Sequence, residues 1–211
     1  MLECGGGPGD DRPRAFRVGV DGGGARTTIR FANGPAVALQ QASLLARVEW
    51  MLRPRLALFA GAGSVVAGTV RAEGADHSLR PGWMATAGVA WLAVNETSRR
   101  PFVSASAMLG YLGAHTRLDD NSPEVPWRAA DVRVGVTVGK TFGRVRPYAA
   151  ARAFGGPVSW HLDGQSITGT DSHHYQLGAG IALDLPAYFD VSLEAVPLGE
   201  QGLAAGLGYR F

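Results

Sequence analysis

The chain has 211 residues, enough for one domain, and 46% of them are hydrophobic, 18% are charged and 30 are glycine. The charged share is below the roughly 25% of an average soluble domain, and the formal net charge is only +2. Lys140 is the only lysine and the arginines are scattered, so we expect no binding to nucleic acid. With Cys4 as the single cysteine, an internal disulfide and a cysteine-based metal site are excluded.

The first 14 residues are rich in glycine, proline and aspartate and predict a disordered tail ahead of one domain at residues 15–211. The tail has no apolar segment of the kind found in a signal peptide. No stretch of the chain reaches the roughly 18 apolar residues of a membrane helix. Many short apolar runs in a glycine-rich chain instead predict an all-β fold.

Beyond the tail, period-two alternation predicts ten strands. Val132, Val134, Val136 and Val138, for example, alternate with polar or small residues such as Arg133. The predicted strands are 15–24, 41–52, 56–69, 83–95, 102–116, 130–142, 145–162, 174–185, 189–198 and 202–211. Pro157 falls inside the long seventh strand and predicts a bulge there or the end of its membrane-embedded part.

The connections between these strands alternate in length. Short turns are expected at 53–55, 97–101, 143–144 and 186–188, and longer loops at 25–40, 70–82, 117–129 and 163–173. Short turns at one end and long loops at the other are typical of a closed antiparallel up-and-down transmembrane β-barrel. We predict such a barrel with about ten strands, with eight or twelve as alternatives, and a soluble ligand-binding barrel as a further alternative.

Charged residues within the strands constrain how the barrel faces lipid. A charge facing lipid at mid-depth costs roughly 2–4 kcal/mol, so these side chains are expected on the inward face. Because both signs occur, they can pair across the lumen. The predicted lumen charge network is Arg17, Asp21, Arg47, Glu49, Arg133, Arg152, Asp184, Glu194 and Arg210. We interpret the network first as a plug, in which the charges pair with one another and fill the lumen. The second interpretation is a narrow polar conduit. Catalytic roles for Glu49 or Glu194 are the least favoured.

Aromatic residues near the strand ends predict two girdles at the membrane–water boundaries. The predicted girdle residues are Phe16, Trp50, Trp83, Trp91, Tyr111, Tyr175, Tyr209 and Phe211. The alternative is that they are ordinary core aromatics of a soluble β-barrel.

The last strand, Leu203–Phe211, alternates apolar and small or polar residues and ends on Tyr209, Arg210 and Phe211. It resembles the terminal strand of small bacterial outer-membrane barrels of the OmpA/OmpX/OmpW kind, and the pattern resembles theirs over most of residues 15–211. The resemblance implies a Gram-negative outer membrane as the location, its lipids and the barrel-assembly machinery as partners, and Tyr209 and Phe211 as the assembly signal. It implies no cofactor. Because such a protein needs a signal peptide, either the true start lies upstream of Met1 or the barrel interpretation is wrong.

The leading functional hypothesis is a non-enzymatic barrel with a structural or surface-interaction role. A narrow channel for small solutes is the second hypothesis. A lipid-modifying enzyme is the third, because Ser159, His161 and Asp163 form the only local trio that suggests nucleophilic catalysis, although their order and spacing do not make a triad. We expect no catalytic residue and no metal ligand, and treat His173 and His174 as solvated loop residues.

Overall fold

A computed structural model describes residues 15–32, 36–72, 74–119, 121–162 and 165–211, and the tail predicted at 1–14 lies outside this part of the chain. The described residues form one antiparallel sheet of thirteen strands. The strands are β1 (Phe16–Phe31), β2 (Ala36–Arg53), β3 (Leu56–Ala72), β4 (Ala75–Leu79), β5 (Gly82–Val94), β6 (Phe102–Arg117), β7 (Val125–Gly139), β8 (Val145–Gly155), β9 (Val158–Leu162), β10 (Gln165–Asp171), β11 (Tyr175–Asp184), β12 (Phe189–Gly199) and β13 (Gln201–Arg210). Among these residues, no helix is long and apolar enough to cross a bilayer.

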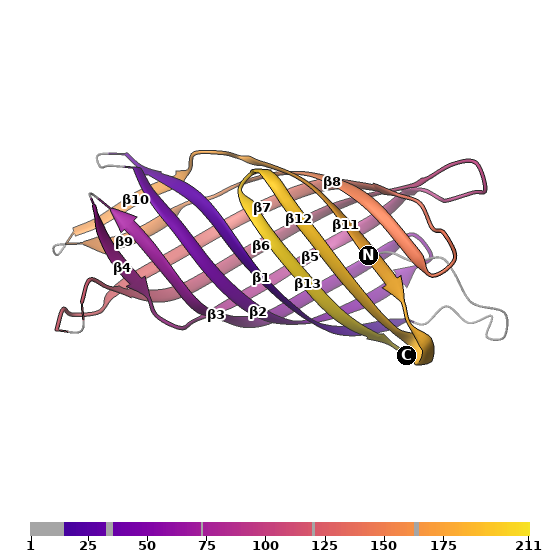
Figure 1. Ribbon diagram of the computed structural model, residues 1–211, viewed down its shortest axis with the longest axis horizontal. Helices are drawn as coiled ribbons and strands as arrows, with labels where there is room; N and C mark the ends of the chain where they lie inside the picture. The colour runs from indigo at the N-terminus through magenta and orange to yellow at the C-terminus, as the bar shows by residue number, and fades with distance from the viewer. Residues whose placement is uncertain (1–14, 33–35, 73, 120, 163–164) are drawn as a thin grey trace.

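Ten of the strands close into a ring in the order β1-β2-β3-β5-β6-β7-β8-β11-β12-β13. The last strand pairs with the first along ten residues, from Arg17 opposite Arg210 to Arg26 opposite Gln201, and this pairing closes the barrel. The prediction of a closed barrel of about ten strands is therefore confirmed. Figure 1 shows the strands inclined to the long axis, with the last strand ending at the end of the barrel that carries the short turns.

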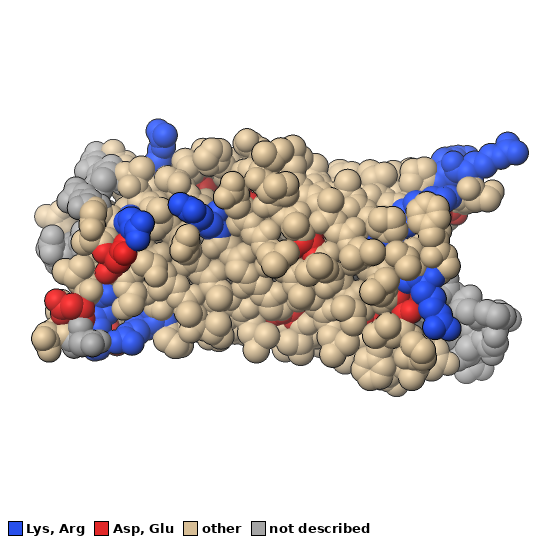
Figure 2. All heavy atoms as spheres, viewed as in Figure 1, with Lys and Arg blue, Asp and Glu red and all other residues tan. Residues whose placement is uncertain are grey.

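The alternation of the sequence separates an apolar outer face from a polar inner face. On β7, Val132, Val134, Val136 and Val138 are all exposed, although they are large and apolar. The inward residue Arg133, by contrast, is partly buried. Figure 2 shows that charged atoms gather toward the two ends of the molecule and that the surface between them is mostly uncharged. We call this outward apolar zone the belt, and a zone of this kind suits lipid rather than water.

A second, smaller ring continues the barrel beyond the belt, at the end opposite the short turns. There the order is β1-β2-β3-β4-β6-β7-β9-β10, and β10 pairs back onto β1 from Ile29 to Phe31. We call this eight-stranded ring the collar; in Figure 1 it is the end that carries β4, β9 and β10. Short turns lie on the periplasmic side of outer-membrane barrels, so the collar is the external end.

The collar corrects three loop predictions. Most of the predicted loop 25–40 is strand, because β1 runs to Phe31 and β2 starts at Ala36. The predicted loops 70–82 and 163–173 contain β4 and β10. In these segments the apolar residues are the inward ones, such as Ile29 and Phe31, because they pack in the collar core and their outward neighbours lie above the lipid. The alternation therefore has the opposite phase to that of the membrane ring.

The predicted strand 145–162 is two strands, β8 and β9, separated at Gly156 and Pro157. A Cβ on Gly156 would lie 1.9 Å from the carbonyl oxygen of Ala130, so only glycine permits the close approach of the two backbones here. Beyond this point β9 pairs with β7 and β10 rather than continuing beside β11. Pro157 thus marks the passage from membrane barrel to collar, as its position in the sequence predicts.

Candidate functional site

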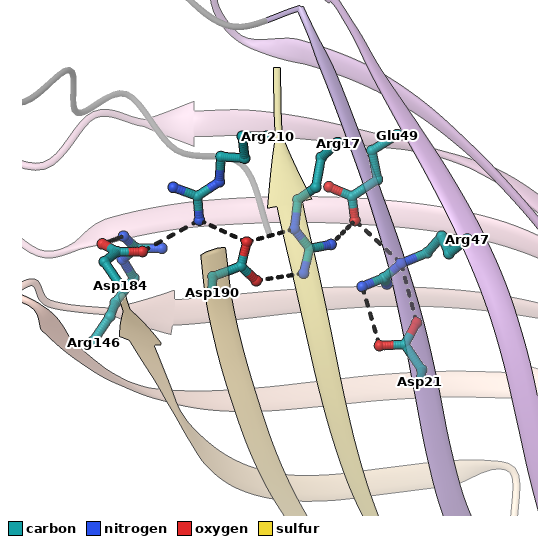
Figure 3. A network of polar contacts seen from close by, with 8 residues as sticks. All are labelled: Arg17, Asp21, Arg47, Glu49, Arg146, Asp184, Asp190 and Arg210. Atoms are coloured by element: carbon teal, nitrogen blue, oxygen red, sulfur yellow. Dashed lines mark hydrogen bonds and ion pairs between the residues drawn. The ribbon is translucent and has the colours of Figure 1, made fainter. Parts of the chain in front are cut away.

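The inner wall at the periplasmic end carries a continuous ionic network centred on Arg17 (Figure 3). The Arg17 guanidinium donates from Nε to Asp190 Oδ2 at 2.9 Å and from Nη1 to Glu49 Oε1 at 3.1 Å. Arg17 is 8% exposed and Asp190 is 4% exposed. β1, β2 and β12 bring these three groups together from positions up to 173 residues apart.

The network continues to both sides of Arg17. Arg47 lies 3.2 Å from Asp21 and 3.3 Å from Glu49. On the other side, Arg210 lies 3.1 Å from Asp190 and 3.2 Å from Asp184. Asp184 also contacts Arg146 at 3.0 Å. Charges of alternating sign thus follow the wall from β2 to β8, and each compensates the desolvation of its neighbours.

Two further ionic clusters lie on the same inner face. Arg152 on β8 pairs with Glu194 on β12 through two hydrogen bonds, one of them 2.8 Å long. Nearer the collar, Arg133 contacts Asp131 at 2.5 Å and Glu200 at 2.9 Å. The structure therefore places all nine residues of the predicted network on the inner face, each in at least one ion pair.

Sequence reasoning missed several members of these clusters. Asp190 is the second residue of β12, next to a turn, and Glu200 is the single residue between β12 and β13. Glu200 falls in the gap between the predicted strands 189–198 and 202–211, yet it is 7% exposed and accepts a hydrogen bond from Gln176 at 2.6 Å. Its turn is made by Gly199 at φ +83°, and this glycine was the signal that the connection is tight enough to direct the next side chain inward.

The collar encloses a cluster of buried apolar side chains. Trp127 and Trp160 are each 1% exposed, with ring centroids 5.6 Å apart in an edge-to-face arrangement. The Trp160 indole donates to Thr116 Oγ1 at 2.8 Å. The buried residues of this collar core are Ile29, Phe31, Val37, Leu39, Val65, Val70, Ala72, Leu79, Leu112, Ala114, Trp127, Val158 and Trp160. Such a core closes the external end of the lumen with packed, water-excluding material.

His77 on β4 packs edge-to-face against Trp160, with ring centroids 5.0 Å apart. Burial lowers the pKa of His77, and the opposing effect of Asp76 is too small to reverse this. The unfolded chain then binds a proton more readily than the folded collar. The stability of the collar is therefore expected to be constant above the ordinary histidine pKa of about 6.5. It should fall as the pH drops from there toward the lowered pKa of His77 in the folded collar.

Amide exchange of β4 at pH 7.5 and pH 5, corrected for intrinsic rates, tests this expectation. Protection should fall at pH 5 in the wild type and stay unchanged in His77→Phe. A fall of equal size in both proteins would assign the effect to other groups.

The outer face carries the predicted girdle residues at the two edges of the belt, where each of the eight is exposed. At the periplasmic edge, Phe16 stacks on Trp50 with centroids 5.9 Å apart and on Phe211 at 6.0 Å. Tyr209 continues the row by contacting Phe211 at 6.2 Å and Phe189 at 5.0 Å. At the external edge, Trp83 stacks on Tyr111, while Tyr175 contacts His173.

The C-terminal Phe211 closes the ring as well as belonging to the girdle. Its amide donates to Phe16 O at 3.1 Å, and its own carbonyl accepts from Phe16 N at 3.4 Å. Deleting Phe211 removes only this last pair and one stacked ring, so detergent refolding should change little. If Phe211 is the assembly signal, the same deletion should greatly reduce assembly into the outer membrane in cells, measured as the heat-modifiable folded band. Equal losses in both assays would reduce Phe211 to a packing residue.

Val158 and Trp160 belong to the collar core. Ser159 and His161 alternate with them along β9 and therefore lie on its outer face. Ser159 Oγ lies 3.4 Å from Ser166 Oγ. No hydrogen bond within the described residues joins Ser159 to His161, and Asp163 falls outside that part of the chain. The described ranges also hold no group of three His, Cys, Asp or Glu residues arranged for a metal ion.

A closed ring, an apolar belt between aromatic edges and an ionic lumen together define the class of outer-membrane β-barrels. Solved structures of this class resemble the chain. The translocator domain of the autotransporter NalP from Neisseria meningitidis is 12% identical, with a TM-score of 0.55 over 96% of this chain and 90% of that one. The outer-membrane protease OmpT from Escherichia coli is 11% identical, with a TM-score of 0.52 over 94% and 97%. The β domain of the Bordetella autotransporter BrkA is 14% identical, with a TM-score of 0.52 over 93% and 100%.

No protein-family profile and no curated protein sequence matches the chain. At these low identities the structural likenesses show the fold alone. The chain is an outer-membrane β-barrel, and its assignment to the OmpA/OmpX/OmpW kind in particular stays a prediction.

Proposed function

We propose that this barrel does not conduct and has a non-enzymatic, structural or surface-interaction role. The observation that carries the proposal is the collar: a closed ring of eight strands whose interior is a packed apolar core. Ions passing along the lumen would have to cross this core, whose buried members are all apolar. The collar also extends a folded surface beyond the belt, as a barrel that contacts other molecules outside the membrane requires.

A narrow channel is the second candidate, and the middle of the lumen favours it. Ser106 lies opposite Gly135, and Ala204 lies opposite Glu194, so both face the lumen. Both are nevertheless exposed to solvent, which shows that the lumen is not filled at this level. Arg47 and Asp21 are also only partly buried, at 26% and 27% side-chain exposure. Water can therefore reach the charges below the collar, so the two candidates differ in whether the collar opens.

Conductance of the purified barrel in a planar bilayer separates the two candidates. The wild type should give no stable unitary currents, whereas Trp127→Ala combined with Trp160→Ala should give them by emptying the collar core. Stable currents in the wild type that fall in Arg47→Trp, but not in Val48→Trp on the lipid face of the same strand, would overturn the proposal and establish the channel.

A further inference from the structure

The outer surface carries a pocket of about 470 Å³ at the external edge of the belt, between the tops of β3, β5, β6 and β7. Trp83, His115, Pro126 and Arg128 are among its lining residues. On β7 the exposed valines of the belt end at Val132, and Arg128 is the first charged residue above them on the outer face. The pocket therefore lies where lipid chains give way to lipid headgroups.

The aromatic side of the pocket is an open, flat ring. Trp83 is 58% exposed, and its ring stacks on Tyr111 with centroids 5.1 Å apart and planes 28° apart. Gly113 lies beside it, where a Cβ would come within 2.9 Å of Trp83 Nε1. The glycine thus leaves room for the indole to lie along the sheet, with part of its surface available to stack on a sugar ring or another flat apolar face.

The polar side of the pocket is cationic. Arg128 is exposed, lies opposite Gly113 in the register of β6 and β7, and makes no side-chain hydrogen bond or ion pair within the described residues. The lumen differs, because every arginine of the predicted network there has a carboxylate partner. His115, two residues beyond Gly113 and on the same outward face, adds an exposed nitrogen donor or acceptor. An exposed guanidinium at this depth, with no ion pair among the described residues, matches a phosphate group.

We propose that this pocket binds the phosphorylated sugar headgroup of an outer-leaflet glycolipid. Trp83 stacks against the sugar, Arg128 contacts the phosphate, and the acyl chains lie along the belt below. The inference is independent of whether the barrel conducts, because the pocket is on the outer face.

Arg26 provides a matched control. It is an exposed outward arginine of β1, and it lines a separate shallow surface pocket of about 610 Å³ together with Gly24, Gln40, Ala42 and Gln201. β1 and β7 are five strands apart in either direction around the ring, so Arg26 lies on the opposite wall. Its pocket has no aromatic residue among those that line it. Arg26 therefore reports general attraction of a cation for anionic lipid, without sugar stacking.

The test is native mass spectrometry of the detergent-solubilised full chain with a bis-phosphorylated acylated glucosamine disaccharide (lipid A). The wild type should retain one molecule, and Arg128→Ala and Trp83→Ala should each weaken retention about tenfold, as the loss of a charge-assisted contact or a stacked ring implies. Arg26→Ala should stay within about twofold of the wild type. The Trp83 and Arg128 side chains are exposed, so the folded, heat-modifiable band should be unchanged in all variants.

Three competitors identify the source of the binding. Dephosphorylated lipid A should bind more weakly than the bis-phosphorylated probe, phosphatidylglycerol should not displace the probe at equal concentration, and free glucosamine 6-phosphate should displace it only at large excess. Equal losses in Arg26→Ala and Arg128→Ala, or equal competition by phosphatidylglycerol, would overturn the proposal in favour of unspecific binding of anionic lipid.

Discussion

Replacing Arg17 with methionine is expected to lower the free energy of unfolding by about 3–5 kcal/mol, because it leaves buried carboxylates without their main partner. Among the described residues, Asp190 would keep its ion pair with Arg210, at 3.1 Å, and Glu49 would keep that with Arg47, at 3.3 Å. Methionine preserves most of the side-chain volume, so the loss reports charge rather than packing. Urea unfolding in detergent micelles, followed by tryptophan fluorescence, measures the change.

Two companion variants make this prediction specific. Arg71→Met breaks an exposed ion pair with Asp76 in the collar and should leave the urea midpoint unchanged. Adding Asp190→Leu to Arg17→Met removes the buried carboxylate as well and should recover part of the loss. If Arg17→Met behaves like Arg71→Met, the lumen network does not stabilise the barrel.

Replacing Trp160 with alanine is expected to lower the free energy of unfolding by about 3–5 kcal/mol, the usual range for removing a large aromatic side chain from a packed core. The indole contacts Trp127 and His77, and its loss also leaves Thr116 Oγ1, fully buried, without its donor. Because the collar core is separate from the lumen network, amide exchange should rise mainly in β4, β9 and β10. The same urea titration and exchange experiment measures both effects.

Trp91→Ala is the matched control for Trp160→Ala. Trp91 is an aromatic residue of the belt edge with 51% exposure, so detergent replaces most of its contacts. Its loss should shift the urea midpoint much less and leave exchange in the collar unchanged. Equal shifts in the two variants, with no local change in the collar, would contradict the view that the collar core is tightly packed.

Period-two alternation predicts the membrane ring well because lipid and lumen impose opposite demands on successive residues. Val132, Arg133 and Val134 show this: the valines are exposed outward and the arginine forms ion pairs inside. The same logic predicts which strand charges face inward. It also predicts the girdle, since stacked pairs such as Phe16 and Trp50 follow from their placement at the ends of neighbouring strands.

The collar could not be predicted in the same way, because outside the lipid the outer face is free to be polar or small. Ile29 and Phe31 belong to its core, but the glycine run at 22–24 and the polar residues at 26–28 before them suggest a loop. Pairing partners such as Asp190 for Arg17 are 173 residues away, and only the closed ring brings them together. Glu200 could not be predicted for a local reason. In a longer loop its side chain would lie in water, but the one-residue connection between β12 and β13 directs it inward.

The two rings of the barrel have a consequence for the order of synthesis. All eight strands of the collar come from residues 16–171, whereas the membrane ring also needs β11, β12 and β13. A nascent chain that ends before Tyr175 already contains every pairing partner of the collar but cannot close around the lumen. During synthesis, all strands of the external collar are therefore made before the last three strands of the membrane ring. The strands that close the barrel in the bilayer are made last.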